Sequence, residues 1–150
     1  MNDLGLEKFL FVARSKTYAG SAGKTKSLLP GTEQFEYKDG DWQYRDNYYN
    51  GKDGFVGIEG VFFANKPVWS MSYVGHYYGL TEEEADKVLK PALLANPETR
   101  GYKDVEAKFD DYIYTCATDL DKSLSEMGGV EEIKRSGKVI YRLYYGGCQL

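Results

Sequence analysis

Apolar and polar positions in this chain follow two periods, one typical of helices and one typical of strands. The first helical set recurs at spacings of three and four residues, at Leu6, Phe9, Leu10 and Ala13. Asp3 precedes it and is predicted to cap this helix. A loop rich in Gly, Ser and Lys is expected from Ser15 to about Gly31.

A second helix is predicted past the middle of the chain. Thr81, with Glu84 three residues later, forms a capping box that starts it. Its apolar positions are Ala85, Val88, Leu89, Ala92 and Leu93. Pro91 lacks a backbone donor, and we expect it to kink or split this helix.

Alternating patterns between the helices predict antiparallel hairpins. The segment FEYKDGDWQYRD is typical of two strands around the turn Asp39-Gly40. A second hairpin is expected with arms at roughly Phe55–Phe63 and Val68–Tyr73. Hairpins join neighbouring strands that run in opposite directions, so the sheet should be mainly antiparallel.

The pattern then begins again, which predicts an internal duplication. A shift of 72 residues places Gly57, Glu59, Val61, Lys66, Val68, Trp69, Met71, Tyr73 and Gly75 on Gly129, Glu131, Ile133, Lys138, Ile140, Tyr141, Leu143, Tyr145 and Gly147. A shift of 70 places Phe35, Glu36, Lys38, Asp41, Trp42 and Tyr44 on Val105, Glu106, Lys108, Asp111, Tyr112 and Tyr114. We therefore expect one α+β domain of two tandem repeats, about 3–78 and 79–150, with two principal helices.

Strand alternation predicts which side chains share a face. One expected inward row is Trp69, Met71, Tyr73, Tyr141, Leu143 and Tyr145. Glu59 and Glu131 each share a face with apolar neighbours, where a carboxylate is costly unless it is paired. Either the two face each other or a ligand, which would raise at least one pKa, or each accepts bonds from amides and Tyr hydroxyls or sits at a rim.

Composition narrows the function classes. The hydrophobic fraction is 42% and the charged fraction 28%, as in ordinary globular proteins. A net charge of −4 argues against direct nucleic-acid binding. We expect a cytoplasmic protein with no membrane contact, because no signal core or long apolar span is visible. Two cysteines are too few for a disulfide framework or a zinc cluster.

Reactive motifs are weak throughout the chain. Gly23-Lys24-Thr25 lacks the glycine that a phosphate-binding loop has five residues earlier, where Tyr18 stands. Basic residues from Arg14 to Lys26 either hold an anion or belong to a solvated loop. His76 is the single histidine, so no multi-histidine metal site is expected. The sequence predicts no catalytic residue, no metal and no cofactor.

The 14 tyrosines are the unusual feature of the composition. Such a surplus in a small domain favours a concave aromatic surface for a small apolar or cationic ligand, or else a contact with a protein partner or a homodimer. The candidate ligand-binding residues are Tyr44, Asp46, Glu59, Trp69, Tyr73, His76, Glu131 and Tyr141.

Several long strings carry a family resemblance: FLFVARSKTYAG, LLPGTEQFEYKDGDWQYRD, GFVGIEGVFFANKPVWSMSYVG and the closing GGVEEI and KVIYRLYYGG. With them the chain resembles a bacterial domain-of-unknown-function family, family 5680. Its members occur alone or C-terminal to Xre-type helix-turn-helix regulators. The resemblance implies a bacterial origin and, for some relatives, a sensor or assembly role, and it brings no catalytic residues.

The preferred hypothesis is a non-enzymatic module that binds a small ligand or a protein, in a transcription-regulatory setting. One alternative is a small hydrolase or isomerase that uses Glu59 or Glu131 as general acid or base. Another is a structural homo-oligomerisation domain that uses its aromatic face as the subunit contact.

Overall fold

The computed structural model describes residues 3–97, 100, 103–118 and 123–150, and the side chains of residues 3 and 4 are not among the described parts. The predicted cap at Asp3 therefore lies outside them. Within these ranges the elements are α1 (Asp3–Lys16), β1 (Lys24–Thr25), β2 (Glu33–Asp39), β3 (Trp42–Asn50), β4 (Gly54–Phe63), β5 (Lys66–Tyr77), α2 (Glu82–Ala95), β6 (Val105–Phe109), β7 (Tyr112–Thr118), β8 (Glu126–Arg135) and β9 (Lys138–Gln149).

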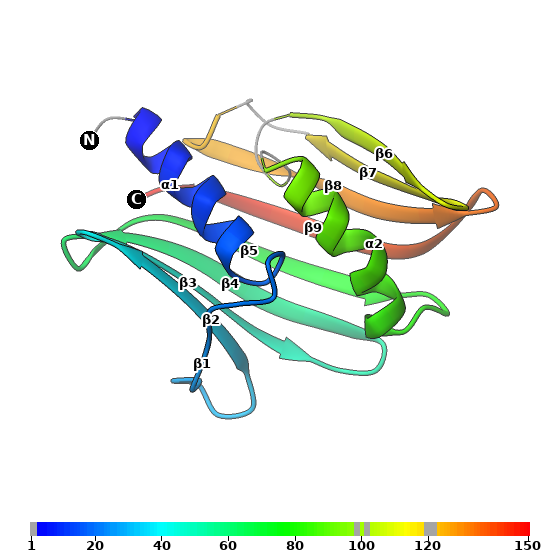
Figure 1. Cartoon of the computed structure of the whole chain (residues 1–150), viewed down its shortest axis with the longest axis horizontal. Coiled ribbons are helices and arrows are strands. Elements are labelled where there is room, and N and C mark those ends of the chain that lie inside the picture. The colour runs from blue at the N-terminus through cyan, green and yellow to red at the C-terminus, as the bar shows by residue number, and fades with distance from the viewer. Residues whose placement is uncertain (1–2, 98–99, 101–102, 119–122) are drawn as a thin grey trace.

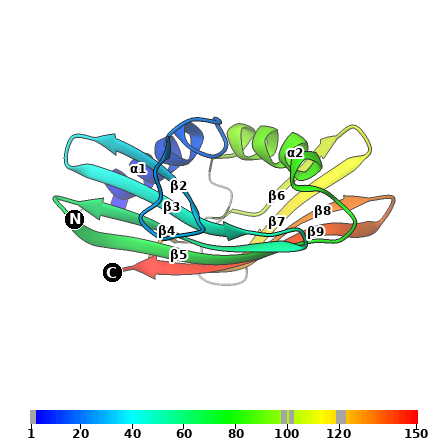
Figure 2. The same cartoon turned by 90° about the horizontal axis from the view of Figure 1, so that it is seen from below.

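One antiparallel sheet of nine strands forms the base of the molecule, in the order β1-β2-β3-β4-β5-β9-β8-β7-β6. Both helices lie on the same face of this sheet (Figures 1 and 2). The two long strands β5 and β9 pair at its centre, where Tyr73 is opposite Tyr145. The α+β class and the mainly antiparallel sheet with two helices are confirmed.

Tight turns set the register of the hairpins. Ala64 and Asn65 join β4 to β5 with φ values of 47° and 64°, the paired positive values of a type I′ turn. Register shifts follow in both long hairpins, between Val61 and Phe62 in one and between Ile133 and Lys134 in the other. These bulges increase the local twist of the strands.

The second helix starts as predicted. The Thr81 side chain accepts from the Glu84 amide, and the Glu84 carboxylate accepts from the Thr81 amide. The predicted split at Pro91 is wrong, because α2 runs continuously from Glu82 to Ala95 with Pro91 inside it. Pro91 lacks the backbone N–H that would donate within the helix. It lies near the end of α2 and its side chain is exposed, so the packing of the helix on the core does not depend on it.

The core lies between the helices and the sheet. Trp69, Met71, Tyr141 and Leu143 are all at most 1% exposed, which confirms the predicted inward row. The opposite face of the sheet carries no helix within the described residues, and apolar side chains such as that of Ile58 are exposed there. None of the helices in the described chain is long and apolar enough to cross a membrane.

The loop expected at 15–31 is partly ordered. Helix α1 continues to Lys16, and the short strand β1 adds to the edge of the sheet beside β2. The basic residues do not form one surface patch, because Arg14 is largely buried on the inner side of α1 and Lys24 pairs with Glu33. Arg14 and Lys24 are thus each paired with a carboxylate.

Candidate functional site

The buried Glu131 carboxylate is fully satisfied by its neighbours. Arg100 donates to it twice, from Nε at 3.0 Å and from Nη2 at 2.9 Å. The hydroxyl of Tyr114 donates at 2.5 Å and that of Tyr141 at 2.8 Å. Each carboxylate oxygen thus accepts two hydrogen bonds, one of them charge-assisted, which is how a buried charge becomes tolerable.

Glu59 on β4 stands opposite Asp46, as Glu131 on β8 stands opposite Cys116, but its carboxylate accepts fewer hydrogen bonds. Arg14 of α1 pairs with its Oε2 at 2.8 Å. Tyr44 stands opposite Val61 as Tyr114 stands opposite Ile133, but within the described residues no hydrogen bond joins its hydroxyl to Glu59. The indole N–H of Trp69, at the position that corresponds to Tyr141, is buried with no partner in the described structure. Buried polar groups rarely stay unpaired, so this side of the core is the unusual one.

The sheet order separates the two glutamates. β5 and β9 lie between β4 and β8, so Glu59 and Glu131 are three strand spacings apart, roughly 14 Å. The interpretation in which they face each other is wrong. The carboxylate beside Glu59 is Asp46, which stands directly opposite it on β3.

Asp46 is the buried carboxylate that lacks a counterion among the described residues. Its side chain is buried, with 6% of the residue exposed, and it accepts a hydrogen bond at Oδ1 from the Tyr73 hydroxyl at 2.5 Å. Burial, and then the charge of Glu59, raise the pKa of Asp46 to about 7, although the Tyr73 hydrogen bond and the charges of Arg100 and Arg14 oppose the rise.

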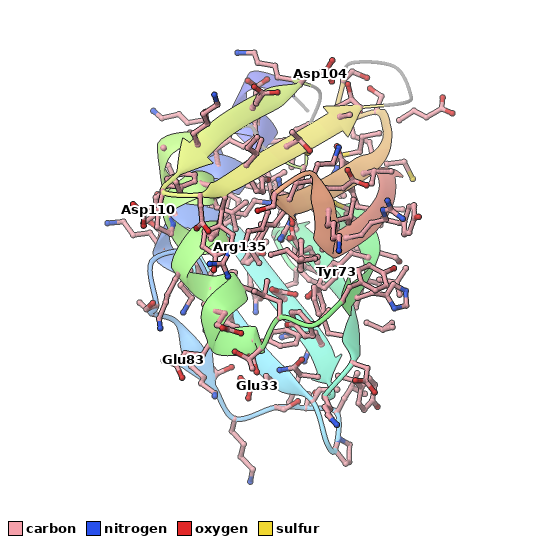
Figure 3. All side chains as sticks on the ribbon, turned by 90° about the vertical axis from the view of Figure 1, so that its right-hand side faces the viewer. Glu33, Tyr73, Glu83, Asp104, Asp110 and Arg135 are labelled. Carbon is pink, nitrogen blue, oxygen red and sulfur yellow. The ribbon has the colours of Figure 1, made fainter. Side chains whose placement is uncertain are left out.

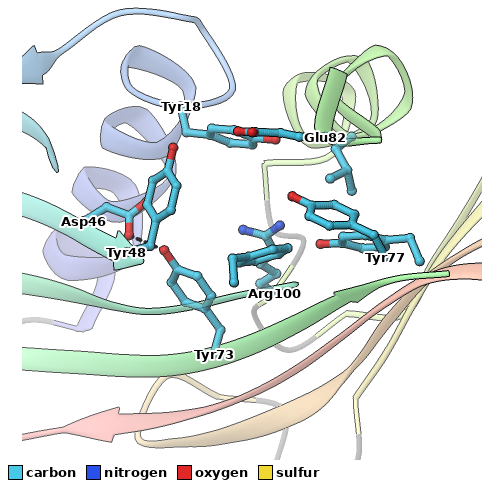
Figure 4. A pocket seen from close by; sticks show the side chains of 10 residues that line it. Tyr18, Asp46, Tyr48, Tyr73, Tyr77, Glu82 and Arg100 are labelled. Atoms are coloured by element: carbon cyan, nitrogen blue, oxygen red, sulfur yellow. Dashed lines mark hydrogen bonds between the residues drawn. The ribbon is translucent and has the colours of Figure 1, made fainter. Parts of the chain in front are cut away.

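An aromatic cleft opens above Asp46, between the two helices and the sheet (Figure 4). Its aromatic side chains are Tyr18, Tyr48, Phe55, Tyr73, Tyr77 and Tyr141. Asp46, Glu82 and Arg100 supply the charged groups. The empty space of the cleft is about 390 Å³ when its open mouth is included, which falls within the size range of small-molecule sites.

A second, more polar cavity adjoins this cleft, since Tyr18, Asp46 and Arg100 line both. Tyr44 and Glu59 line the second cavity. Asp46 lies where an aromatic space and a polar space meet. This junction is the candidate site.

Tyr18 crosses above the cleft from the end of α1 to α2 (Figure 4). Its hydroxyl donates to Oδ1 of Asp86, and the Lys90 ammonium lies 5.1 Å from the centre of its ring. Burial, with the nearby charge of Asp86, raises the pKa of Tyr18 far above its ordinary range, so its hydroxyl stays protonated and can donate. This contact ties the two helices together over the site.

The predicted candidate residues divide into three groups. Asp46, Tyr73 and Tyr141 line the aromatic cleft, and Tyr44, Glu59 and again Asp46 line the polar cavity. Trp69 and Glu131 support the site from the core, where the Trp69 ring lies 5.6 Å from the Arg14 guanidinium. His76 is exposed on the helix-free face, because strand alternation points it away from Tyr73 and Tyr77, and it has no place in the cleft.

Sequence reasoning missed Arg14 and Arg100 as interior groups. Arg14 falls next to the apolar stripe of α1, a position that the helical period could have flagged. Arg100 lies between α2 and β6, where no period applies. Among the described residues, no group of three His, Cys, Asp or Glu side chains could hold a metal ion.

The comparisons with known proteins identify the family. The model of a family described as a domain of unknown function (DUF5680) matches residues 46–150. This chain belongs to that family. The matched part of this DUF5680 domain runs from Asp46 itself through both long hairpins and α2. No curated protein and no solved structure matches the chain.

Proposed function

We propose that this DUF5680 domain is a non-enzymatic module that binds a small ligand in the cleft between α1 and α2. The observation that carries the proposal is the buried Asp46 carboxylate, which has no counterion among the described residues and sits at the floor of an aromatic cleft. Aromatic walls with a few convergent polar groups are the usual lining of ligand sites.

The surroundings of the two glutamates favour binding over acid–base catalysis. Each accepts a hydrogen bond from an arginine, and Glu131 also accepts from the hydroxyls of Tyr114 and Tyr141, so both carboxylates are engaged in the structure of the core. Cys116 is buried against Tyr145, and burial raises the pKa of its thiol, which opposes use as a nucleophile.

The cellular setting follows from the family resemblance. We infer a bacterial, cytoplasmic protein in which ligand binding serves transcription regulation, as the association of some relatives with Xre-type helix-turn-helix domains suggests. The ligand would then act through the tie between the helices at Tyr18 and Asp86, which spans the mouth of the cleft.

We also infer that the scaffold arose by duplication of one helix-plus-strands unit. Support comes from the sheet order, which reads alike outward from the central β5 and β9, and from the matching bulges after Val61 and Ile133. Asp46 stands opposite Glu59 as Cys116 stands opposite Glu131. A duplicated scaffold makes the differences between the halves informative about function.

A pair of neighbouring substitutions tests whether ligands enter the cleft. Glu82 lines the cleft mouth, whereas Glu83 beside it has a side chain 84% exposed and lies on the outside of α2 (Figure 3). Glu82→Trp should close the mouth, and Glu83→Trp should leave it open. Both remove one acidic group from the first turn of α2. Glu83→Trp also removes an exposed pair with Lys87, which contributes little to stability.

The readout is a thermal-shift screen of a small-molecule library on the wild type and both variants. Compounds that raise the Tm of the wild type should also raise that of Glu83→Trp and lose their effect on Glu82→Trp. The proposal fails if no compound raises the Tm, or if the active compounds stabilise Glu82→Trp as well as the wild type.

A further inference from the structure

We propose that the ligand of this cleft is a small organic monocation with a planar body, held through its charged nitrogen by Asp46. The inference rests on the proposed function and names its ligand class. It is carried by the charge balance of the interior, by the difference between the two halves, and by the chemistry of the cleft walls.

The described interior around the site is one positive charge short. Three carboxylates are buried there, those of Asp46, Glu59 and Glu131, and two guanidinium groups reach them, those of Arg14 and Arg100. When Asp46 is ionised, the buried carboxylates therefore outnumber the guanidinium groups by one. Each guanidinium binds a glutamate at close range, so the uncompensated charge resides on Asp46. A buried charge of this kind is costly until a counterion arrives.

The second half shows that the scaffold itself does not require this charge. Tyr145 contacts the neutral Cys116 at 3.6 Å, just as Tyr73 contacts Asp46. Tyr73 and Tyr145 stand opposite each other on the central strands β5 and β9. A neutral side chain therefore fills this place well. The ionised carboxylate of Asp46 lowers the stability of the folded state, and the scaffold does not need it. This points to a role in binding a ligand.

The walls of the cleft suit a planar cation. Tyr48, Phe55 and Tyr77 place aromatic rings around the space above Asp46. The face of an aromatic ring attracts a cation and also packs against a flat apolar body. Glu82 at the mouth adds a second negative charge on the path inward. A ligand whose charged nitrogen reached Asp46 would place its flat apolar body among these rings.

An anionic ligand would meet the wrong groups. Nε and Nη2 of Arg100 both donate to Glu131, and Arg14 is engaged with Glu59 and with the Arg100 carbonyl. Arg100 lines the cleft together with Asp46 and Glu82, so an anion that approached Arg100 would also meet the negative charges of those two carboxylates. The electrostatics of the described residues thus select against negative charge.

Three isosteric probes separate charge from shape: benzamidinium, benzamide and benzoate. Their planar bodies are nearly identical, and their charges are positive, neutral and negative. Binding is measured by isothermal titration calorimetry with the wild type, Asp46→Asn and the control Asp41→Asn. Asp41 is exposed in the β2–β3 turn, so the control removes a carboxylate outside the cleft.

Benzamidinium should bind the wild type and Asp41→Asn alike, at least tenfold more tightly than benzamide, with benzoate weakest. Asp46→Asn should lower the affinity for benzamidinium at least tenfold and leave that for benzamide unchanged. Thermal unfolding of each variant shows that it is folded. Cationic hits of the library screen that lose binding in Asp46→Asn would support the inference in the same way.

The opposite results are distinct for the two proposals. Equal binding of benzamide or benzoate, insensitivity of benzamidinium to Asp46→Asn, or a set of screen hits that is neutral or anionic would overturn the monocation and leave the cleft as a binding site. A library without any hit that Glu82→Trp suppresses would overturn the proposed function itself.

Discussion

Replacement of Asp46 by Asn should stabilise the protein, and the gain should depend on pH. The folded chain holds the Asp46 proton up to a pKa of about 7, whereas the ordinary value of an exposed aspartate is 3.8. Between these two pH values the folded state binds more protons than the unfolded state. The free energy of unfolding of the wild type therefore falls as the pH rises from about 4 to about 7, and this contribution is constant above that range.

The magnitude follows from the difference between the two pKa values. At about 1.4 kcal/mol for each pKa unit, ionised Asp46 costs the folded state on the order of 4 kcal/mol above pH 7. Burial and the nearby Glu59 cause most of this cost, and the Tyr73 hydroxyl, Arg100 and Arg14 reduce it. Asparagine keeps an oxygen that can accept from Tyr73 and carries no charge.

The assay is urea denaturation followed by fluorescence at pH 5, 6, 7 and 8, for the wild type, Asp46→Asn and Asp41→Asn. Asp46→Asn should already lead the wild type by about 1–2 kcal/mol at pH 5, because an unfolded aspartate is mostly ionised there while the folded one is protonated. The variant should lead by several kcal/mol at pH 8, and Asp41→Asn should track the wild type throughout. A difference that is constant with pH, or a wild type that gains on Asp46→Asn as the pH rises, would refute this account of Asp46.

Three further substitutions test the packing that positions the site. Glu131→Gln leaves the Arg100 charge buried without its partner and should cost about 3–5 kcal/mol of unfolding free energy in chemical denaturation. Thr81→Ala removes the capping box of α2 and should cost about 1 kcal/mol, with loss of helical circular dichroism at a lower temperature. Gly57→Ala places a methyl group against the Tyr73 ring, closer than van der Waals contact allows, and should cost about 1–3 kcal/mol.

Matched controls separate these effects from general loss of stability. Glu126→Gln changes an exposed carboxylate on the same strand as Glu131 and should be nearly silent. Gly60→Ala adds a methyl group that would lie 3.4 Å from the Phe62 ring, an ordinary van der Waals contact. Its loss of stability should therefore be well below that of Gly57→Ala. If Glu131→Gln were as mild as Glu126→Gln, the pair with Arg100 would not support the core.

The elements and their faces were predictable from sequence because their causes are local. Apolar residues at helical spacing placed α1 and α2, and alternation placed Trp69 and Tyr141 in the core. The capping box and the hairpins also rest on neighbours a few residues apart. The predicted split of α2 at Pro91 was wrong, because the effect of a proline on a helix depends on how near the helix end it lies.

Only the tertiary structure decided which charges are compensated. Arg14 reaches Glu59 across 45 residues, and Arg100 reaches Glu131 across 31, so no local period links either pair. From the sequence, Glu59 and Glu131 were both predicted to share a face with apolar neighbours, and nothing distinguished their surroundings. The order of strands separated them by β5 and β9, and the register set Asp46 beside Glu59 instead. Charge compensation depends on distance in space, and for that reason Asp46 could be recognised as the uncompensated carboxylate only in the folded chain.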